Sequence, residues 1–443
     1  MINKSMLKED IKKLVIKYML PSVLGMLGLS CCIFLDTMFI GRGIGDLGLA
    51  ALNIAIPFFN IFTAISLLTG VGGATLLAIK MGKQEYEVID EIFTVAIIAT
   101  VIIGIIFGGS CLIFINEIIK ALGATGIIFI YVKEYLQIIL FGAVLFILST
   151  TLNVFVRNDG NPKISMWAII GANIVNIILD YILIFPLNMG MRGAAIATTT
   201  AQVCGIIILC FHFILKKNKM KFSLKKLKGR YVKRILNNGF PSFVLEVSAA
   251  IVIVVFNIKL KAIGGDISIS AYSIIVNFSL IIIAVFNGIA QGVQPIVSMN
   301  YGAKKYSRVL EAYRSGIKWT IFLGAIFFIL GEICPNLIID IFSKDPSRLK
   351  EIGATGIRIY FIALIPMGIN IFNVGMLQSM EKARISTIIS LIRGLVLVIL
   401  LLEILAALFG LNGIWMTTPI VEGITLIISC LCIFKEKKYI EMV

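Results

Sequence analysis

Long apolar runs separated by short polar segments fill the chain from residue 17 to residue 434. A helix rises about 1.5 Å per residue and the hydrocarbon core of a bilayer is about 30 Å thick, so each run is long enough to cross a membrane. The pattern predicts an all-α polytopic membrane protein with twelve transmembrane helices. The expected spans are 17–40, 50–78, 92–115, 127–156, 165–186, 193–215, 239–262, 269–298, 315–340, 355–380, 386–409 and 413–434.

The chain repeats itself. Matching residues recur at a constant offset of 220 positions: Pro21-Ser22 and Pro241-Ser242, Ala51 and Ala271, Gly72 and Gly292, Asn153-Val154 and Asn373-Val374, Gly193 and Gly413, and Thr198 and Thr418. We predict an N-terminal six-helix lobe over 1–220 and a C-terminal six-helix lobe over 221–443, with a linker within 216–234. Because six is even, the lobes are parallel repeats, an arrangement found in secondary transporters.

Two short connections, at Gly82 and Gly302, occupy equivalent places in the two halves. We expect tight turns there, in which glycine adopts a positive φ.

Composition and charge place the chain in a membrane. The residues are 59% hydrophobic with a mean hydropathy of +1.01, whereas soluble domains are about 45–50% apolar. With both termini in the cytoplasm, 29 Lys and Arg residues lie on that side and eight on the other, which matches the positive-inside rule. Lys133, Arg358 and Arg393 fall within spans and are left uncounted. We therefore expect a multi-pass protein of the cell membrane, monomeric and in contact with membrane lipids. The basic block Lys216 to Arg234 is interpreted as a retention signal rather than a nucleic-acid site.

Several chemistries are excluded. The eight cysteines all lie in apolar spans without a CxxC pair, which is typical of reduced packing residues. His212 is the only histidine, so neither a histidine-rich metal centre nor a histidine proton chain is expected. We predict that the protein is not an enzyme and needs no cofactor beyond a coupling ion.

Four oxygen-bearing side chains lie at similar depths in three spans of the first half. Asp36 is about 6 Å from the outer end of its span, Asp180 about 9 Å and Thr198 about 8 Å. Asn176 precedes Asp180 by one helical turn and lies on the same face. Such hard oxygen atoms suit Na⁺ or, with one acid protonated, a proton. Asp36, Asn176, Asp180 and Thr198 are the predicted cation-coupling residues, and the Na⁺ ligands if Na⁺ is used.

Other interpretations of these residues stay open. Asp36 could reach headgroup water. Asn176 and Thr198 could simply bond across helices, and for Thr198 this is favoured by its repetition as Thr418. The acids themselves have no counterpart at the 220-residue offset, where Phe256 and Leu400 stand. This asymmetry favours a functional role.

The second half supplies weaker candidates. Glu246, about 10 Å into its span, is predicted to bind a cationic substrate or a second coupling ion. Gln291 and Gln294, together with Asn277, give the following span a polar face that could line a cavity. Glu422, about 13 Å deep, is a weaker candidate, and Glu332 and Glu403 are expected to reach water.

An ordered set of motifs resembles the multidrug and toxic compound extrusion (MATE) family over nearly the whole chain. The motifs are Asp36-Thr-Met-Phe-Ile-Gly, Asn176-Ile-Ile-Leu-Asp180, Gly193-Ala-Ala-Ile-Ala-Thr198 and Gly239-Phe-Pro-Ser. The resemblance implies an antiporter that exports organic cationic drugs by alternating access as Na⁺ or H⁺ enters. It also implies a cation site at Asp36, Asn176, Asp180 and Thr198.

The resemblance extends to Glu246, which matches a seventh-helix acid used in some members. The stretch Tyr360 to Asn370 departs from the pattern, because it has no acid where some members carry an aspartate. A second ion site resting on Glu246 alone is therefore in doubt.

Two alternatives compete with an exporter. A lipid-linked saccharide flippase belongs to the same broad fold class, but an anionic lipid calls for cations in the cavity, whereas the charges within the spans are chiefly acids. A membrane enzyme acting on lipids would need a cluster of His, Asp or Cys near an interface, and the sequence has none. A channel would be expected to repeat a filter-like loop, which is also missing.

Overall fold

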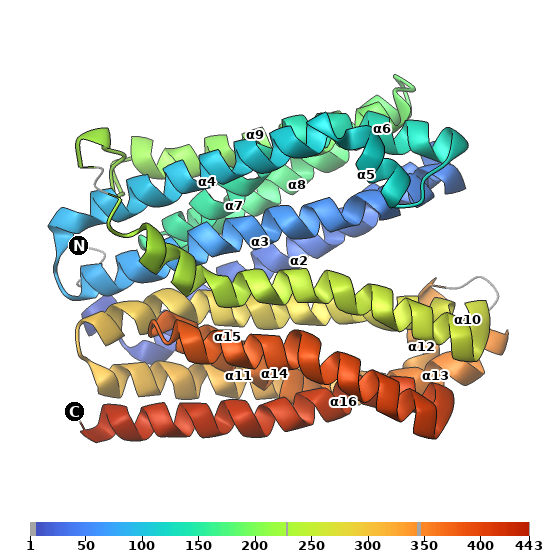
Figure 1. Ribbon diagram of the computed structural model, residues 1–443. Coiled ribbons are helices and arrows are strands. Elements are labelled where there is room, and N and C mark those ends of the chain that lie inside the picture. Colours follow the sequence, from blue (N-terminus) through green and yellow to red (C-terminus); the bar gives the residue numbers. More distant parts are fainter. Residues whose placement is uncertain (1–5, 227–228, 343–346, 443) are drawn as a thin grey trace. The chain divides into compact units, whose positions relative to one another are not determined.

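The computed structural model describes residues 6–226, 229–342 and 347–442, and every regular element in these ranges is a helix (Figure 1). The chain divides into two compact units. The described residues of the first unit fall in Leu24–Phe243, and those of the second in Lys4–Val23 and Val244–Val443. The predicted lobe boundary between 220 and 221 stays a prediction, and residues 227 and 228 of the predicted linker lie outside the described ranges.

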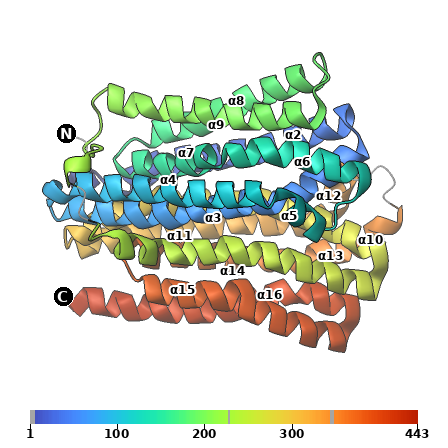
Figure 2. The same cartoon turned by 45° about the horizontal axis from the view of Figure 1, so that its top comes forward.

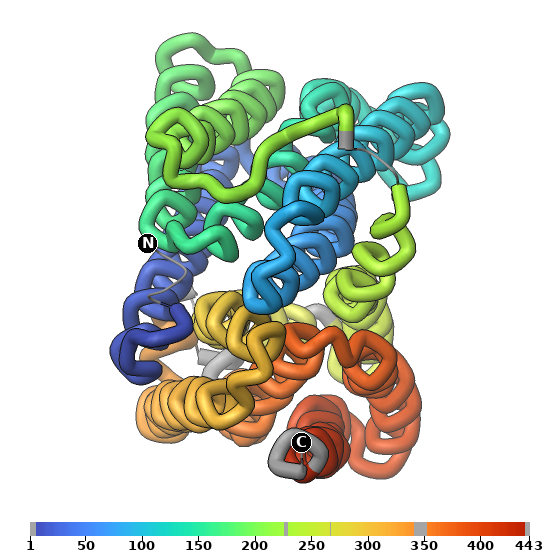
Figure 3. The backbone as a smooth tube through the Cα atoms, turned by 90° about the vertical axis from the view of Figure 1, so that its left-hand side faces the viewer, coloured from blue at the N-terminus to red at the C-terminus, as the bar shows by residue number. Residues whose placement is uncertain are grey.

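The first unit is built from helices that run along a common direction (Figure 3). Its elements are α2 (Ile11–Gly43, from Leu24 on), α3 (Asp46–Gly82), η1 (Tyr86–Val88), α4 (Ile89–Ile113), α5 (Ile115–Ala121), α6 (Gly126–Phe141), α7 (Ala143–Asn158), α8 (Pro162–Ile184), α9 (Gly190–Ile214), η2 (Leu224–Lys226) and the start of α10 (Val232–Gly302). Helices α8 and α9 lie side by side (Figure 2), which brings the motifs they carry together.

The second unit follows the same plan. Its elements are the start of α2 up to Val23, the rest of α10, α11 (Tyr306–Ile333), α12 (Pro335–Phe342), α13 (Ser347–Phe361), α14 (Leu364–Ser379), α15 (Ala383–Leu391), the π-helix η3 (Ile392–Val396) and α16 (Leu397–Met442). Helix α10 breaks at Gly265 and α16 breaks at Gly410, where positive φ angles of 65° and 56° interrupt the helix. Only glycine adopts these conformations without steric cost.

The predicted twelve spans are confirmed. Among the described residues, nine helical segments are long and apolar enough to cross a membrane, and two bent pairs add one span each. The pairs are α6 with α7, bent by 52°, and the later part of α13 with α14, bent by 43°. The last of the nine, Ala383–Lys438, divides at the Gly410 break into two spans, so nine, two and one make twelve.

Backbone conformation confirms the internal repeat. Residues with positive φ recur at the same offset of 220 positions: Gly45 and Gly265, Gln84 and Lys304, and Gly190 and Gly410. The turns expected near Gly82 and Gly302 are present, but the prediction that these glycines adopt a positive φ is wrong, because both still belong to helices. The left-handed residues are Gln84 (φ 62°) and Lys304 (φ 56°), where the chain leaves the helix.

Two helices are shared between the units. Helix α2 belongs to the second unit up to Val23 and to the first unit from Leu24. Helix α10 belongs to the first unit up to Phe243 and to the second unit from Val244. Each change follows a proline by two residues, Pro21 in α2 and Pro241 in α10. Because proline removes a helical hydrogen bond, each helix is most easily bent at this point.

An aromatic and aliphatic core holds the first unit together. The rings of Phe62 on α3 and Phe146 on α7 stack with centroids 5.5 Å apart, and Phe59 contacts both of them and Tyr135 on α6. All belong to one buried cluster or pack against it. The core thereby fixes α6 and places Tyr135 at its centre.

Candidate functional site

Two carboxyl groups face each other inside the first unit. Asp180 on α8 is fully buried, and Asp36 on α2 is half-buried with its Oδ1 atom shielded from solvent. Their side chains are close enough to share a hydrogen bond. Among the described residues, no N–H or O–H group meets hydrogen-bond geometry at Asp36 Oδ1 or at either Asp180 oxygen. Two like charges in contact repel each other, so this pair requires a proton or a cation.

Asn176 lies one turn from Asp180 on the same face of α8, as the i, i+4 spacing predicts, and is buried. Its Oδ1 atom accepts a hydrogen bond of 2.9 Å from the thiol of Cys32 on α2. The amide nitrogen therefore points away from Cys32, and the side chain lies against the Asp180 carboxyl group. The oxygen predicted to face the cation is instead paired with a thiol, which the sequence reasoning had treated as packing.

Thr198 on α9 and Tyr135 on α6 complete the arrangement. The Thr198 hydroxyl donates to the backbone oxygen of Ala194 at 2.8 Å, which leaves its lone pairs available as acceptors. The phenol of Tyr135 is fully buried beside Thr198 and both carboxyl groups. Tyr135 was missed because nothing in its own span marks it; only the packing of α6 against α9 brings it to this place.

The four predicted cation-coupling residues thus meet in one unit, together with Tyr135 and Cys32. The atoms available to bind an ion are carboxylate, hydroxyl and phenol oxygens, and an amide lies beside them. Such a set fits a proton or a small hard cation. Among the residues that the structure describes, no group of three or more His, Cys, Asp and Glu side chains is arranged to hold a metal ion.

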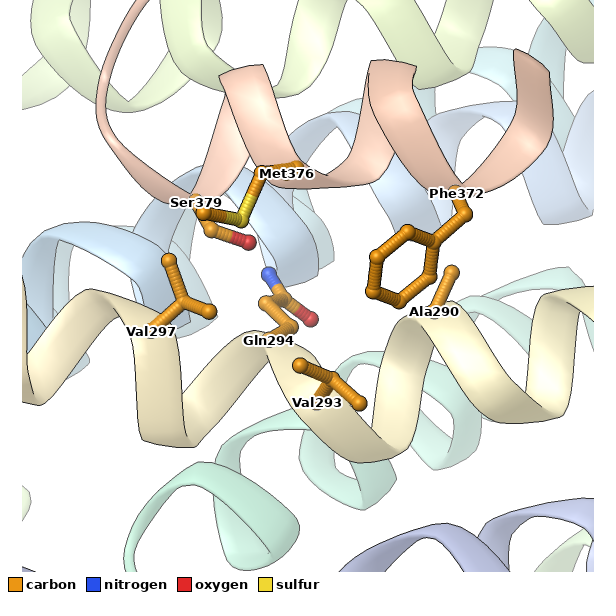
Figure 4. A pocket seen from close by; sticks show the side chains of 7 residues that line it. All are labelled: Ala290, Val293, Gln294, Val297, Phe372, Met376 and Ser379. Carbon is orange, nitrogen blue, oxygen red and sulfur yellow. The ribbon is translucent and has the colours of Figure 1, made fainter. Parts of the chain in front are cut away.

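The predicted residues of the second unit are more scattered. Glu246 on α10 is half-buried and makes no hydrogen bond or ion pair within the described part of the chain. Gln294 is buried and points into a narrow pocket lined by Phe372, Met376 and Ser379 of α14 (Figure 4). Gln291 is half-buried and Asn277 is exposed, and neither lines this pocket.

Two further acids of the second unit are paired. Glu422 on α16 is buried and bound by Arg393 of η3, a residue that the sequence reasoning had set aside. Glu403 is half exposed and forms an ion pair with Lys259.

Comparison with known proteins finds the same organisation. The profile of the MatE family matches residues 21–182 and 240–404, well over half of the chain. The chain is 27% identical over 432 residues to the multidrug export protein MepA of Staphylococcus haemolyticus, and the match covers 96% of this chain and 94% of the relative. It is 26% identical to MepA of Staphylococcus aureus, with the same coverage.

Solved structures share the fold. A multidrug resistance MATE family transporter of the MOP superfamily, in an outward-facing conformation, superposes with a TM-score of 0.93 at 22% identity and covers 98% of both chains. A MOP superfamily transporter from Pyrococcus furiosus also superposes with a TM-score of 0.93, at 21% identity over 99% of this chain and 98% of its own. That protein is described as having a binding pocket of reverse polarity that suggests a different function.

The family match falls in both six-helix repeats and includes the segments that carry Asp36, Asn176, Asp180 and Glu246, whereas Thr198 lies outside it. The resemblance inferred from the motifs is confirmed. The chain is a multi-pass membrane protein and belongs to the MatE family, whose members are transporters rather than enzymes.

Proposed function

We propose that the protein is a cation-coupled antiporter that exports organic cationic drugs and other toxic compounds across the cell membrane. Its relatives MepA are named multidrug export proteins and match over nearly their whole length. The coupling ion is H⁺ or Na⁺, and the ion is a transported substrate rather than a resident cofactor.

One observation carries this proposal. Asp36 and Asp180 approach each other with buried oxygen atoms that lack donors among the described residues. An ionised side chain costs about 2.5–3.5 kcal/mol at the centre of a membrane helix on insertion scales and less toward an interface. Here two like charges also repel each other, so an uncompensated pair is unfavourable. Binding a monovalent cation relieves this repulsion. The site is therefore suited to bind and release such an ion reversibly.

Coupling follows if the conformations of the transporter differ in their affinity for the ion. A ligand shifts a conformational equilibrium only by its differential affinity for the two states, and the effect of one ligand on another is reciprocal. In our proposal the ion favours one orientation and the drug favours the opposite one. Asp36 lies on α2, which carries Pro21, so a change of charge at the site acts on a helix that bends readily.

Glu246 is our first candidate for binding a cationic drug, because it is a half-buried carboxyl group with no partner in the described part of the chain. Gln291, Gln294 and Asn277 are the accompanying polar candidates on α10. Counting the ions moved per drug molecule in Glu246 variants decides whether Glu246 instead binds a second coupling ion.

We further propose that both termini lie in the cytoplasm, since Lys and Arg residues are concentrated on that side, and that a single chain is the transporting unit. Within the predicted spans, acids also outnumber unpaired cations. Asp36, Asp180 and Glu246 are acidic, whereas Arg393 is balanced by Glu422. This favours cationic drugs over the anionic lipid of a flippase.

The test uses purified protein in proteoliposomes loaded with ethidium, first under an imposed Na⁺ gradient and then under an imposed pH gradient. We expect one gradient to drive efflux in the wild type. Asp36→Asn and Asp180→Asn should each abolish this driven efflux, while Asp46→Asn, at an exposed acid in the first turn of α3, should not. Driven efflux that persists in both site variants at equal reconstitution rules out the assigned site. Movement of a labelled lipid-linked saccharide without ethidium efflux would establish the flippase instead.

A further inference from the structure

The Glu422 carboxyl group in the second unit is already bound by a cation of the chain itself. Arg393 Nε lies 2.8 Å from Oε1 and 3.0 Å from Oε2 of Glu422, and Arg393 Nη2 lies 2.8 Å from Oε1. The amide of Asn370 on α14 donates to Oε2 at 2.7 Å. Both carboxyl oxygens therefore accept hydrogen bonds, and at least one donor is a charged guanidinium group.

A directed chain of hydrogen bonds ends at this carboxylate. Tyr313 donates to Asn373 at 3.1 Å, Asn373 to Ser429 at 3.1 Å, and Ser429 to the Oδ1 atom of Asn370 at 2.8 Å. The amide nitrogen of Asn370 is then left to donate to Glu422. The Ser429 hydroxyl also lies within hydrogen-bond distance of the backbone oxygen of Leu426, at 3.2 Å. The donors that reach Glu422 itself, Arg393 and Asn370, cover both carboxyl oxygens, which fits the ionised carboxylate.

The pair lies deep in the membrane. Arg393 is ten residues beyond the first residue of α15, Ala383, and Glu422 is twelve residues beyond the break at Gly410. At 1.5 Å per residue these separations are about 15 and 18 Å, close to the middle of a core about 30 Å thick. Arg393 is carried by the π-helix η3, and such single π turns frequently occur at functional sites.

The two units resemble each other around this position. Thr418 is the repeat partner of Thr198, and each threonine lies beside a buried tyrosine: Tyr135 of α6 in the first unit and Tyr360 of α13 in the second. Tyr360 also lies near Arg393 and Glu422 and against Ser279 of α10. The first unit thus has facing carboxyl groups without a cation, whereas the second has one carboxylate that holds a guanidinium group.

We infer that Arg393 acts as a built-in cation at Glu422, occupying in the second unit the place that a coupling ion takes in the first. Glu422 then exchanges no ion during transport, and the number of ions moved per drug is limited by this arginine. Removing Arg393 while keeping Glu422 opens a latent second site for a proton or Na⁺. This inference rests on the proposed function for the statement about transport, but the state of Glu422 is measured independently of transport.

The test counts protons taken up by the purified full-length protein as the solution goes from about pH 9 to about pH 5. This range lies above the ordinary pKa of a glutamate, about 4.3, so only a carboxyl group with a raised pKa takes up a proton within it. The variants are Arg393→Gln, the double variant Arg393→Gln with Glu422→Gln, and Arg393→Lys. We expect Arg393→Gln to take up about one proton more than the double variant, because its Glu422 has lost its counter-charge. Arg393→Lys, which keeps the charge, should match the wild type.

The comparison of wild type with the double variant does not depend on the folding of Arg393→Gln. Equal proton uptake by these two proteins supports the inference, whereas one extra proton in the wild type shows that Glu422 titrates with Arg393 present and overturns it. The same variants are then assayed for ethidium efflux with and without Asp36→Asn. If Asp36→Asn does not reduce efflux while the proton counts are as expected, the proposed function is refuted. The inference about Glu422 then still stands.

Discussion

The thiol of Cys32 donates a hydrogen bond of 2.9 Å to the Oδ1 atom of Asn176, from one turn before Asp36 on α2 to one turn before Asp180 on α8. Both residues are buried. The bond joins the two helices that carry the carboxyl groups and determines which end of the Asn176 amide faces them. Cys32 therefore positions Asn176 at the candidate ion site.

Replacing Cys32 by serine keeps a donor at this position, whereas Cys32→Val removes it. A hydrogen bond of this kind contributes about 0.5–1.5 kcal/mol, so we expect Cys32→Val to change the apparent ion affinity by about 2- to 10-fold and Cys32→Ser to have less effect. The measurement is the ion concentration that gives half-maximal driven efflux. Cys31→Val, at the exposed neighbouring cysteine, is the control. Identical ion dependence in Cys32→Val and Cys31→Val contradicts the positioning role.

Tyr135→Phe removes only the hydroxyl that lies beside Thr198 and the two acids and keeps the ring that fills the core. We expect driven efflux to need a several-fold higher ion concentration, since a neutral hydrogen bond accounts for about 1 kcal/mol. Thermal stability should change little. The matched control is Tyr131→Phe, one turn earlier on α6 and only partly buried. An unchanged ion dependence would exclude the Tyr135 hydroxyl from the site.

Gly72 marks a close approach of two helices in the first unit. A Cβ atom there would lie 2.0 Å from the backbone oxygen of Ile235 and 2.8 Å from the nitrogen of Gly239. Backbone atoms cannot move aside as a flexible side chain does, so Gly72→Ala should destabilise the protein by about 1–3 kcal/mol. Gly109→Ala, where a Cβ meets open space on α4, should be neutral or slightly stabilising. Thermal unfolding of both variants in the same detergent decides, and equal transition temperatures contradict the packing argument.

A buried polar contact attaches the segment after α9 to the first unit. Asp159 accepts hydrogen bonds from His212 Nε2 at 2.8 Å and from the backbone nitrogen of Lys219 at 2.9 Å, and Asp159 and His212 are fully buried. His212→Ala removes this donor from the buried carboxyl group, and a hydrogen bond to a charged group contributes about 1.5–3 kcal/mol. His212→Gln, which keeps a donor, should lose less.

The readout for His212 is the temperature of unfolding together with the rate of trypsin cleavage within 216–234. Faster cleavage in His212→Ala than in His212→Gln supports the attachment. Similar cleavage of both variants and the wild type shows that Asp159 does not hold this segment.

Apolar run length, charge bias and the 220-residue offset were sufficient to predict the helix count, the all-α fold and the repeat. These properties depend on local sequence, because a lipid environment requires each span to satisfy its own backbone hydrogen bonds. The depth of each residue along its helix was also enough to predict that Asp36, Asp180 and Thr198 lie at one level in the membrane. The turns were predicted less well. The left-handed residues are Gln84 and Lys304 and not the glycines before them, because the position of a positive φ depends on where each helix ends.

The partners across helices were decided only by the tertiary structure. Nothing near Tyr135 or Cys32 in the sequence distinguishes them from packing residues, and Arg393 and Glu422 are separated by a complete helix hairpin. Helical spacing specifies the depth and the face of a side chain but not which helix lies opposite that face. The sequence by itself therefore determined the acids at membrane depth, and tertiary packing decided that one pair of acids lacks a cation while Glu422 has one.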